Sequence, residues 1–171
     1  PIEKIESYFN TGEYKYLGVT VMPGPQLRQA IPVSKAIKAK FPEAKIIWGG
    51  YFPSTQPDAV LCSGFVDFII NGPGDHAFPQ LIDALSNNTP FEFIKNIIYK
   101  TDRGIIKNGK EDLIDQETLP PLPYNKLTDF YPMEKYLGRT YLGNKTLAYH
   151  SSIGCPFTCS FCAVVPIYEA R

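Results

Sequence analysis

Three cysteines near the carboxyl end of the sequence offer a set of metal ligands. Cys155, Cys159 and Cys162 fall in the stretch GCPFTCSFC with the spacing C-x3-C-x2-C. A flexible loop with this spacing can wrap around one face of an iron-sulfur cube, so that three thiolates each bind one iron and the fourth iron stays open. Zinc is the main alternative, although structural zinc takes four protein ligands and only His150 lies nearby. Simple burial of three thiols in a core is a third interpretation, and it suits a short cysteine-rich loop poorly.

A set of glycines offers a second kind of site, because each one follows directly on a strand-like segment. They are Gly24, Gly49, Gly50, Gly72 and Gly74. In doubly wound sheets, ligands bind beyond the carboxyl ends of the strands, where glycine lets the backbone approach a large planar or phosphorylated group. Three such loops could line one pocket. The alternative is that these short loops use glycine only to turn, and the stretch GPGD lacks the Lys and the Ser or Thr of a phosphate-binding loop.

Alternating strands and helices must position these loops. Apolar, β-rich runs predict strands at 14–22, 44–50 and 65–75. Apolar spacings of three and four predict helices at 1–10, from about 31 to 41, and at 76–88, with a short helix or turn at 57–64. Such alternation predicts a Rossmann-like (flavodoxin-like) α/β fold, a parallel sheet with helices on both faces.

Two details of the helices carry separate expectations. Pro32 predicts that the second helix becomes regular near Ile31 rather than at Gln26, because proline lacks an N–H and is best placed in a first turn. In the helix at 76–88, the apolar residues fall on one face and predict its core contact; they are Phe78, Leu81, Ile82 and Leu85.

The second half of the chain departs from this alternation. Residues 93–110 contain two strand-like runs joined through TDRG, which predicts a hairpin added to the sheet. Residues 111–145 are proline-rich with little periodicity and predict a linker. Residues 145–153 predict a new strand, with the cysteines in the loop that follows. The expected domains are therefore 1–110, the linker 111–145, and the start of a further domain at 146–171.

Composition narrows the class of protein. Lys and Arg total 17 and Asp and Glu total 17, so no net charge draws the chain to nucleic acid or to an anionic membrane. No apolar run reaches a membrane span and no signal peptide is evident, which predicts a cytoplasmic protein. A disulfide framework is not expected, since Cys62 stands alone. The start at Pro1 and the end at Arg171 suggest a fragment of a longer protein.

The motif GCPFTCSFC resembles the cluster-binding loop of radical S-adenosylmethionine enzymes, including Phe161 directly before the third cysteine. The stretch from VTVMPGPQ through IIWGGYFPSTQP to VDFIINGPGD is similar to the cobalamin-binding domain that precedes the radical domain in one large subgroup. That subgroup includes methyltransferases and the anaerobic cyclase of chlorophyll synthesis. The resemblance runs from about Tyr16 to Cys162.

This resemblance implies cofactors and residues that bind them. The three cysteines would bind a 4Fe-4S cluster, whose open iron would hold S-adenosylmethionine, and Phe161 would pack near the adenine. Three loops would line the groove for the nucleotide tail of cobalamin; their residues are Met22, Gly24, Gln26, Gly49, Gly50, Tyr51, Gly72 and Gly74. A bulky residue at Gly49 or Gly50 should block this groove. The sequence departs from the family at Pro23, Phe52 and the stretch 72–75.

The expected function is methyl transfer or oxidative cyclisation of a small-molecule or cofactor-like substrate, with an electron donor protein as partner. Cobalamin is expected to bind without a protein histidine ligand, since neither His76 nor His150 is well placed. In the alternative, the Rossmann-like domain is a degenerate docking or regulatory module of a radical enzyme; a zinc-binding adaptor is a third possibility. A barrel needs roughly 200 residues or more, so this chain alone should be inactive and its cysteine loop mobile.

Overall fold

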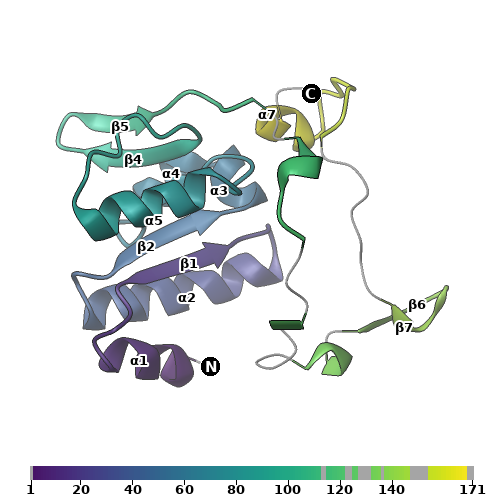
Figure 1. Cartoon of the computed structure of the whole chain (residues 1–171), viewed down its shortest axis with the longest axis horizontal. Coiled ribbons are helices and arrows are strands. Elements are labelled where there is room, and N and C mark those ends of the chain that lie inside the picture. The colour runs from purple at the N-terminus through teal and green to yellow at the C-terminus, as the bar shows by residue number, and fades with distance from the viewer. Residues whose placement is uncertain are drawn as a thin grey trace. The chain divides into compact units, whose positions relative to one another are not determined.

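The computed structural model describes residues 2–112, 115–121, 125–126, 132–135, 137–146 and 154–168. The chain divides into two compact units. The first comprises residues 1–113 together with 155–171, and the second comprises residues 114–154. The candidate site lies in the first unit, which is built around a single five-stranded sheet (Figure 1).

The sheet is mixed, with strands in the order β1-β2-β3-β4-β5. The first three strands are parallel and the last two are antiparallel. Their bounds are β1 Tyr16–Thr20, β2 Lys45–Gly49, β3 Phe68–Ile70, β4 Ile97–Thr101 and β5 Gly104–Lys107. The predicted Rossmann-like sheet is confirmed, and so is the added hairpin, which is β4–β5.

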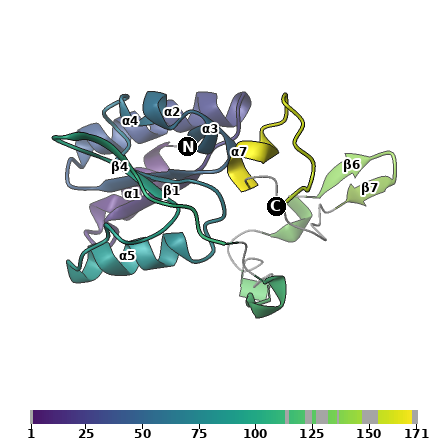
Figure 2. The ribbon, with the colours of Figure 1, turned by 90° about the horizontal axis from the view of Figure 1, so that it is seen from above.

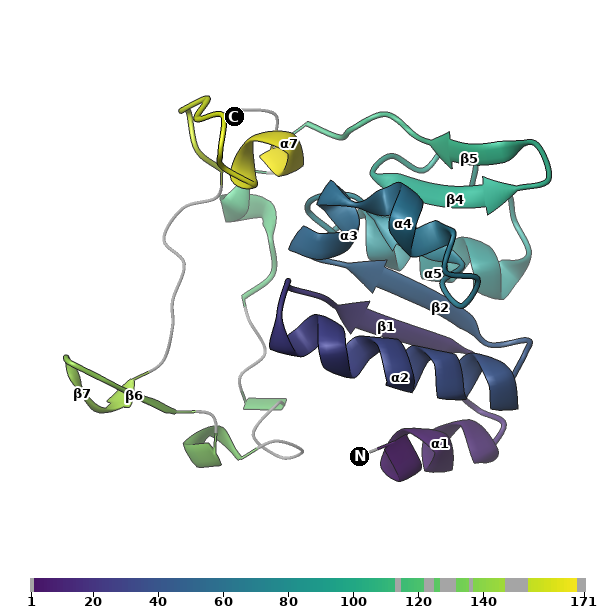
Figure 3. The same cartoon turned by 180° about the vertical axis from the view of Figure 1, so that it is seen from behind.

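Helices cover both faces of this sheet, as Figure 2 shows. Helices α2, α3 and α4 lie on one face and α5 lies on the other; Figure 3 gives the view from the α2 side. Helix α1 packs against α2, with the rings of Phe9 and Phe41 5.3 Å apart. The bounds are α1 Ile2–Asn10, α2 Pro25–Lys40, α3 Tyr51–Thr55, α4 Pro57–Leu61, α5 Ala77–Asn87 and α7 Val164–Tyr168. Among the described residues, none of the helices is long and apolar enough to cross a bilayer.

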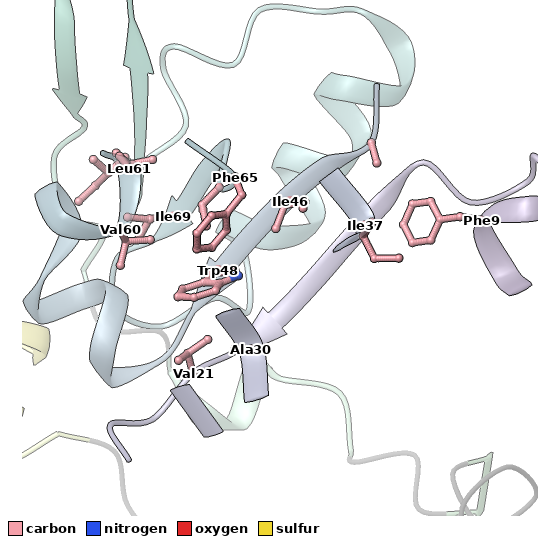
Figure 4. Packing of buried hydrophobic residues seen from close by; sticks show 13 residues of the cluster. Phe9, Val21, Ala30, Ile37, Ile46, Trp48, Val60, Leu61, Phe65 and Ile69 are labelled. Carbon is pink, nitrogen blue, oxygen red and sulfur yellow. The ribbon is translucent and has the colours of Figure 1, made fainter. Parts of the chain in front are cut away.

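Each face of the sheet has its own apolar cluster. The cluster beneath α2 and α4 centres on Trp48, which is 1% exposed and packs against Phe65 (Figure 4). The indole Nε1 of Trp48 donates a hydrogen bond to Ser34 Oγ at 2.9 Å, so the buried polar atoms of both residues are satisfied. The cluster beneath α5 is formed by Ile47, Phe68, Ile70, Ala77, Leu81, Ile97 and Tyr99.

A half-buried carboxylate joins one helix and two strands at the amino end of β3. Asp67 stands just before β3 and accepts hydrogen bonds from Lys38 Nζ at 2.8 Å and from the backbone N–H of Ile46 at 2.8 Å. The Lys38 side chain also donates to Ala44 O at 2.9 Å. Helix α2 and strands β2 and β3 are thereby joined at the edge opposite the glycine loops.

The predicted start of the second helix is wrong. Helix α2 begins at Pro25, not near Ile31, and it runs through Pro32. Pro25 occupies the first turn, where no intrahelical N–H bond is lost, and Gly24 supplies the turn with φ 93°. Pro32 is exposed, so its ring and its lost hydrogen bond face solvent, and the burial of Ala30, Ser34 and Ile37 holds the helix together on its other side. Helix α3 was likewise not predicted.

The second unit contains short elements. They are the 3-10 turns η1 Gln116–Thr118 and η2 Met133–Lys135 and the strands β6 Gly138–Thr140 and β7 Gly143–Thr146. Strands β6 and β7 pair as an antiparallel hairpin within the stretch expected to be a linker. The strand predicted at 145–153 falls outside the described residues beyond Thr146.

Candidate functional site

The three glycine-bearing loops meet at one edge of the sheet. Because β1, β2 and β3 are parallel, the loops that follow them leave from the same side. The first two loops are joined directly, since Val21 N donates to Gly49 O at 2.8 Å and Phe52 N donates to Val21 O at 3.0 Å. The convergence expected from the sequence is therefore present in the backbone.

A cavity of about 360 Å³ opens at this edge, between the end of β1 and the second and third loops. It has little side-chain bulk, because five of the residues lining it are glycines. These are Gly18, Gly49, Gly50, Gly72 and Gly74, and the apolar side chains beside them include Ile47, Ile70 and Phe78. A flat or extended ligand could therefore lie close to the backbone at the carboxyl end of the sheet.

Two of these glycines adopt conformations that other residues avoid. Gly50 has φ 93° and ψ −169°, and a Cβ there would stand 3.0 Å from Val21 O. Gly72 has φ 109°, and its Cβ would stand 3.2 Å from both Ile167 O and Lys110 Nζ. Both positions combine an unfavourable dihedral with a close neighbour, so their backbone path depends on glycine.

Ser54 fixes the third loop from the side of α3. Its buried hydroxyl donates to Ile70 O at 3.4 Å and accepts a hydrogen bond from Gly72 N at 3.1 Å. The hydroxyl thus joins the end of β3 to the first glycine of the loop. Ser54 therefore holds the loop that lines the cavity, while its own side chain does not line the cavity.

The hairpin supports the same loop from its other side. Asn96 accepts a hydrogen bond from Asn71 N through its backbone carbonyl at 2.7 Å, and its side-chain Nδ2 donates to Pro73 O at 3.3 Å. Asn96 Oδ1 accepts from Glu111 N at 2.9 Å. The loop 71–75 is therefore held on both sides by side chains that reach it from other elements.

The segment after the cysteines packs on this loop within the first unit. Lys110 Nζ donates to Asn71 O at 3.0 Å and to Ile167 O at 2.9 Å, so it joins the third loop to α7. Ile167 is 5% exposed. Burial raises the pKa of the Tyr168 phenol, and the neighbouring Tyr51 and Asp75 add to this effect. The glycine loops and the residues that follow Cys162 are thus in contact.

The cysteines themselves do not form a closed ligand set. All three are free thiols; Cys155 and Cys162 are half-buried and Cys159 is exposed. Cys162 N donates to Cys159 O at 3.1 Å, which makes a tight turn between them, and Phe161 is 91% exposed. Among the described residues, no group of three or more His, Cys, Asp or Glu side chains is arranged to hold a metal ion. The type and spacing of the thiols fit a cluster, whereas their present arrangement does not.

A comparison with protein families gives a match over the stretch that contains the glycine-lined cavity. The family model described as the B12 binding domain matches residues 1–82. This stretch contains β1, β2 and β3 and the loops that follow them. The segment 1–82, which matches the B12-binding domain, also contains all the residues that line the cavity.

Relatives of known name extend the likeness beyond this B12-binding domain. An uncharacterized methyltransferase of Pyrococcus horikoshii is 28% identical over 78% of this chain and 28% of its own length. The bacteriochlorophyllide d C-8(2)-methyltransferase of Chlorobaculum tepidum is 23% identical over 99% of this chain and 33% of its own. The predicted resemblance to a cobalamin-binding domain is confirmed by the family match, and these relatives are named as methyltransferases.

A solved structure shares the fold. The radical S-adenosylmethionine methyltransferase TsrM from Kitasatospora setae, solved with cobalamin and a 4Fe-4S cluster bound, matches with a TM-score of 0.66 and 19% identity. The match covers 99% of this chain and 34% of that protein. The chain thus spans about a third of the length of these relatives.

The residues predicted to bind cofactor lie at three places in the B12-binding domain. Gly49, Gly50, Gly72 and Gly74 line the cavity. Met22 and Gly24 lie on the exposed loop before α2, and Gln26 lies in the first turn of α2, where its Oε1 accepts a hydrogen bond from Met22 N at 3.0 Å. Tyr51 begins α3 near Tyr168. The cavity is thus built chiefly by the second and third loops together with β1.

His76 stands at the start of α5, and its Nδ1 lies 3.1 Å from Glu111 Oε1. This hydrogen bond gives the ring a partner in the protein. His150 lies outside the described residues.

Several residues that shape the site were not predicted. Gly18 and Phe78 line the cavity, and Ser54, Asn96 and Lys110 hold its third loop. Of these, Gly18 could have been found, because a lone glycine inside a strand pattern indicates a close approach to the backbone. The others depend on contacts between elements far apart in sequence.

Proposed function

We propose that this chain is the cobalamin-binding part of a cobalamin-dependent radical S-adenosylmethionine enzyme that transfers a methyl group. One observation carries the proposal: the residues that match the B12-binding domain place a glycine-lined cavity at the carboxyl ends of three parallel strands. Methyl transfer is preferred to oxidative cyclisation, because relatives of the chain are named as methyltransferases. The alternative of a degenerate docking module is disfavoured by the open cavity.

In this proposal the chain holds the corrinoid and keeps its nucleotide tail away from water. Gly49, Gly72 and Gly74 leave room for the tail, while Ser54 and Lys110 fix the wall formed by the third loop. A bound corrinoid would supply the chemistry of methyl transfer. The hydrogen bond between His76 and Glu111 supports the expectation that no histidine of the B12-binding domain ligates the metal.

The cysteine loop is proposed to bind a 4Fe-4S cluster and, through its open iron, S-adenosylmethionine. The chemistry of the donors supports this, since three thiols with this spacing suit a cube with one iron left open. Cluster binding would require the three sulfurs to converge, which is expected to happen when metal neutralises their charge. The exposed ring of Phe161 is available to cover the adenine. An electron donor protein would be needed to reduce the cluster.

The corrinoid site can be tested by filling the cavity. Gly49 ends β2, and a Cβ there would stand 3.7 Å from Ile70 Cβ, which is an ordinary contact. Gly49→Leu in the full-length protein should therefore fold but occupy the cavity, and weaken cobalamin binding by about ten- to a hundredfold. Anaerobic titration followed by the absorption spectrum of the corrinoid measures the dissociation constant.

Gly109→Leu is the matched control for this experiment. Gly109 is exposed, and a Cβ there meets no atom within 4 Å, so binding should stay as in the parent. If Gly49→Leu binds cobalamin as tightly as the parent, or the parent binds none, the module interpretation is correct.

The cluster site can be tested with the four cysteines. After anaerobic reconstitution with iron and sulfide, the full-length protein should hold one 4Fe-4S cluster. Cys155→Ala, Cys159→Ala or Cys162→Ala should abolish it, because each removes one of three protein ligands. Cys62→Ala is the control, since Cys62 is an exposed thiol that lies far in sequence from the other three cysteines. Iron and sulfide analysis with the visible spectrum gives the result; stoichiometric zinc without iron would contradict the proposal.

A further inference from the structure

Phe78 differs from the other apolar residues of α5. Ala77, Leu81 and Ala84 are buried, whereas Phe78 is 36% exposed and lines the glycine cavity. Its place in the first turn is fixed by a hydrogen bond from Phe78 N to Gly74 O at 3.0 Å. The sequence pattern had assigned this ring to the core face; its apolar surface is instead presented to the cavity.

The ring reaches from α5 to the backbone of β1. A Cβ at Gly18 would stand 3.1 Å from Phe78 Cζ and 3.3 Å from Phe78 Cε2, shorter than the 3.4–4 Å of ordinary contact. Gly18 is the middle residue of β1, two residues before the strand ends at Thr20. The tip of the ring therefore occupies the space that a side chain at position 18 would take. The tip of the ring thus lies at the level of Gly18, two residues inside the carboxyl end of β1.

We propose that Phe78 closes the inner end of the glycine-lined cavity and contacts the aromatic base of a corrinoid's nucleotide tail, so that it selects corrinoids that carry such a base. This inference rests on the proposed cobalamin site and assigns a specificity to it. A planar base entering between Gly49, Gly72 and Gly74 meets a flat apolar ring at the end of its path. Aromatic rings in such contact attract each other beyond the effect of burial alone. A corrinoid without the base does not reach Phe78.

The test compares two ligands, cobalamin and cobinamide, the corrinoid that lacks the nucleotide tail. Both dissociation constants are measured in the full-length protein by anaerobic titration. Phe78→Ala should weaken cobalamin binding on the order of tenfold, because it removes the ring contact and leaves a void. Cobinamide binding should not change. The preference for cobalamin over cobinamide should fall by the same factor.

Two further variants test the inference from independent sides. Gly18→Ala should also lower the preference for cobalamin, because its methyl group takes the space of the ring tip and we expect the ring to move toward the cavity. Phe78→Leu keeps an apolar side chain of similar reach and should fold even where Phe78→Ala does not; it should show a smaller loss. Phe93→Ala is the control, since Phe93 is 90% exposed and does not line the cavity.

The outcomes separate this inference from the proposed function. If the parent binds cobalamin but Phe78→Ala and Phe78→Leu leave its preference over cobinamide unchanged, the selection by Phe78 is wrong and the corrinoid site stands. Equal weakening of both ligands would also overturn it, because that result shows a general effect on the fold. If the parent binds neither corrinoid, the proposed function itself fails, and the inference fails with it.

Discussion

At the scale of single residues, two adjacent glycines of the B12-binding domain serve different purposes. Gly49 has an ordinary backbone conformation and space for a Cβ, so its value lies in leaving the cavity empty. Gly50 has a backbone conformation that is almost confined to glycine. A Cβ at this position would stand 3.0 Å from Val21 O and 3.1 Å from Val21 N. The sequence-based expectation that a bulky residue at either position tests the groove therefore applies to Gly49. At Gly50 the substitution tests the fold.

We expect this difference to appear in stability. Gly50→Ala should lower the free energy of unfolding by about 3 kcal/mol, because a strained dihedral and a backbone contact add. Gly49→Ala should change it by less than about 1 kcal/mol, since alanine suits the end of a strand. Urea denaturation followed by the fluorescence of Trp48, the single tryptophan, measures both values. Equal losses in the two variants would contradict the assignment of separate roles.

The limits of sequence reasoning also show at this scale. Glycines that follow strands could be recognised, because a loop at the carboxyl end of a parallel strand is a known place for ligands. The position of Phe78 could not, since spacings of three and four give the apolar face of a helix but not which of its residues extends beyond the core. The role of Lys110 could not be predicted either, because its hydrogen bond to Ile167 O joins residues 57 positions apart.

At the scale of elements, the alternation of strands and helices was predictable because its signals are local. The parallel strands carry continuous apolar runs, and the hairpin of β4 and β5 follows from the turn residues between them. Helix α2 was misplaced because local rules weigh Pro32 heavily. Burial of Ala30, Ser34 and Ile37 against the sheet outweighs that cost, which is a tertiary effect.

Short elements were missed for a related reason. Helix α3 spans only Tyr51–Thr55, too few residues to show a periodicity. It forms because Gly50 turns the chain and because Ser54 is tied to Ile70 O and Gly72 N. Helix α3 depends on these contacts with neighbouring loops and strands, so the sequence pattern alone could not predict it.

At the scale of the whole molecule, the first compact unit combines the glycine-lined cavity with the segment that follows the cysteines. Lys110 contacts both the third loop and α7, and Ile167 is buried there. A displacement of the third loop would therefore alter the hydrogen bond between Lys110 and Ile167 in α7, a few residues after Cys162. This contact gives the chain a direct physical link between the proposed corrinoid and cluster sites.

Stability of the unit against alkali should depend on Tyr99. The ring of Tyr99 is 7% exposed and lies 5.1 Å from the ring of Phe91. Burial raises the pKa of its phenol above the usual value of about 10, and the Glu92 carboxylate adds to this. Because the folded state holds the proton more tightly than the unfolded state, Tyr99 contributes stability below pH 10. That contribution is lost as the pH rises through the higher folded pKa.

The free energy of unfolding should therefore fall above about pH 10, with a contribution of up to about 1.4 kcal/mol per pH unit from this one proton. Tyr99→Phe keeps the aromatic packing and removes the titrating group, so its alkaline loss should be shallower than that of the parent. Tyr141→Phe is the control, because Tyr141 is 96% exposed and belongs to the second unit. Urea denaturation between pH 8 and about 11.5, followed by Trp48 fluorescence, measures the slopes. Identical slopes for the parent and Tyr99→Phe would show that the folded state does not hold this proton more tightly than the unfolded chain.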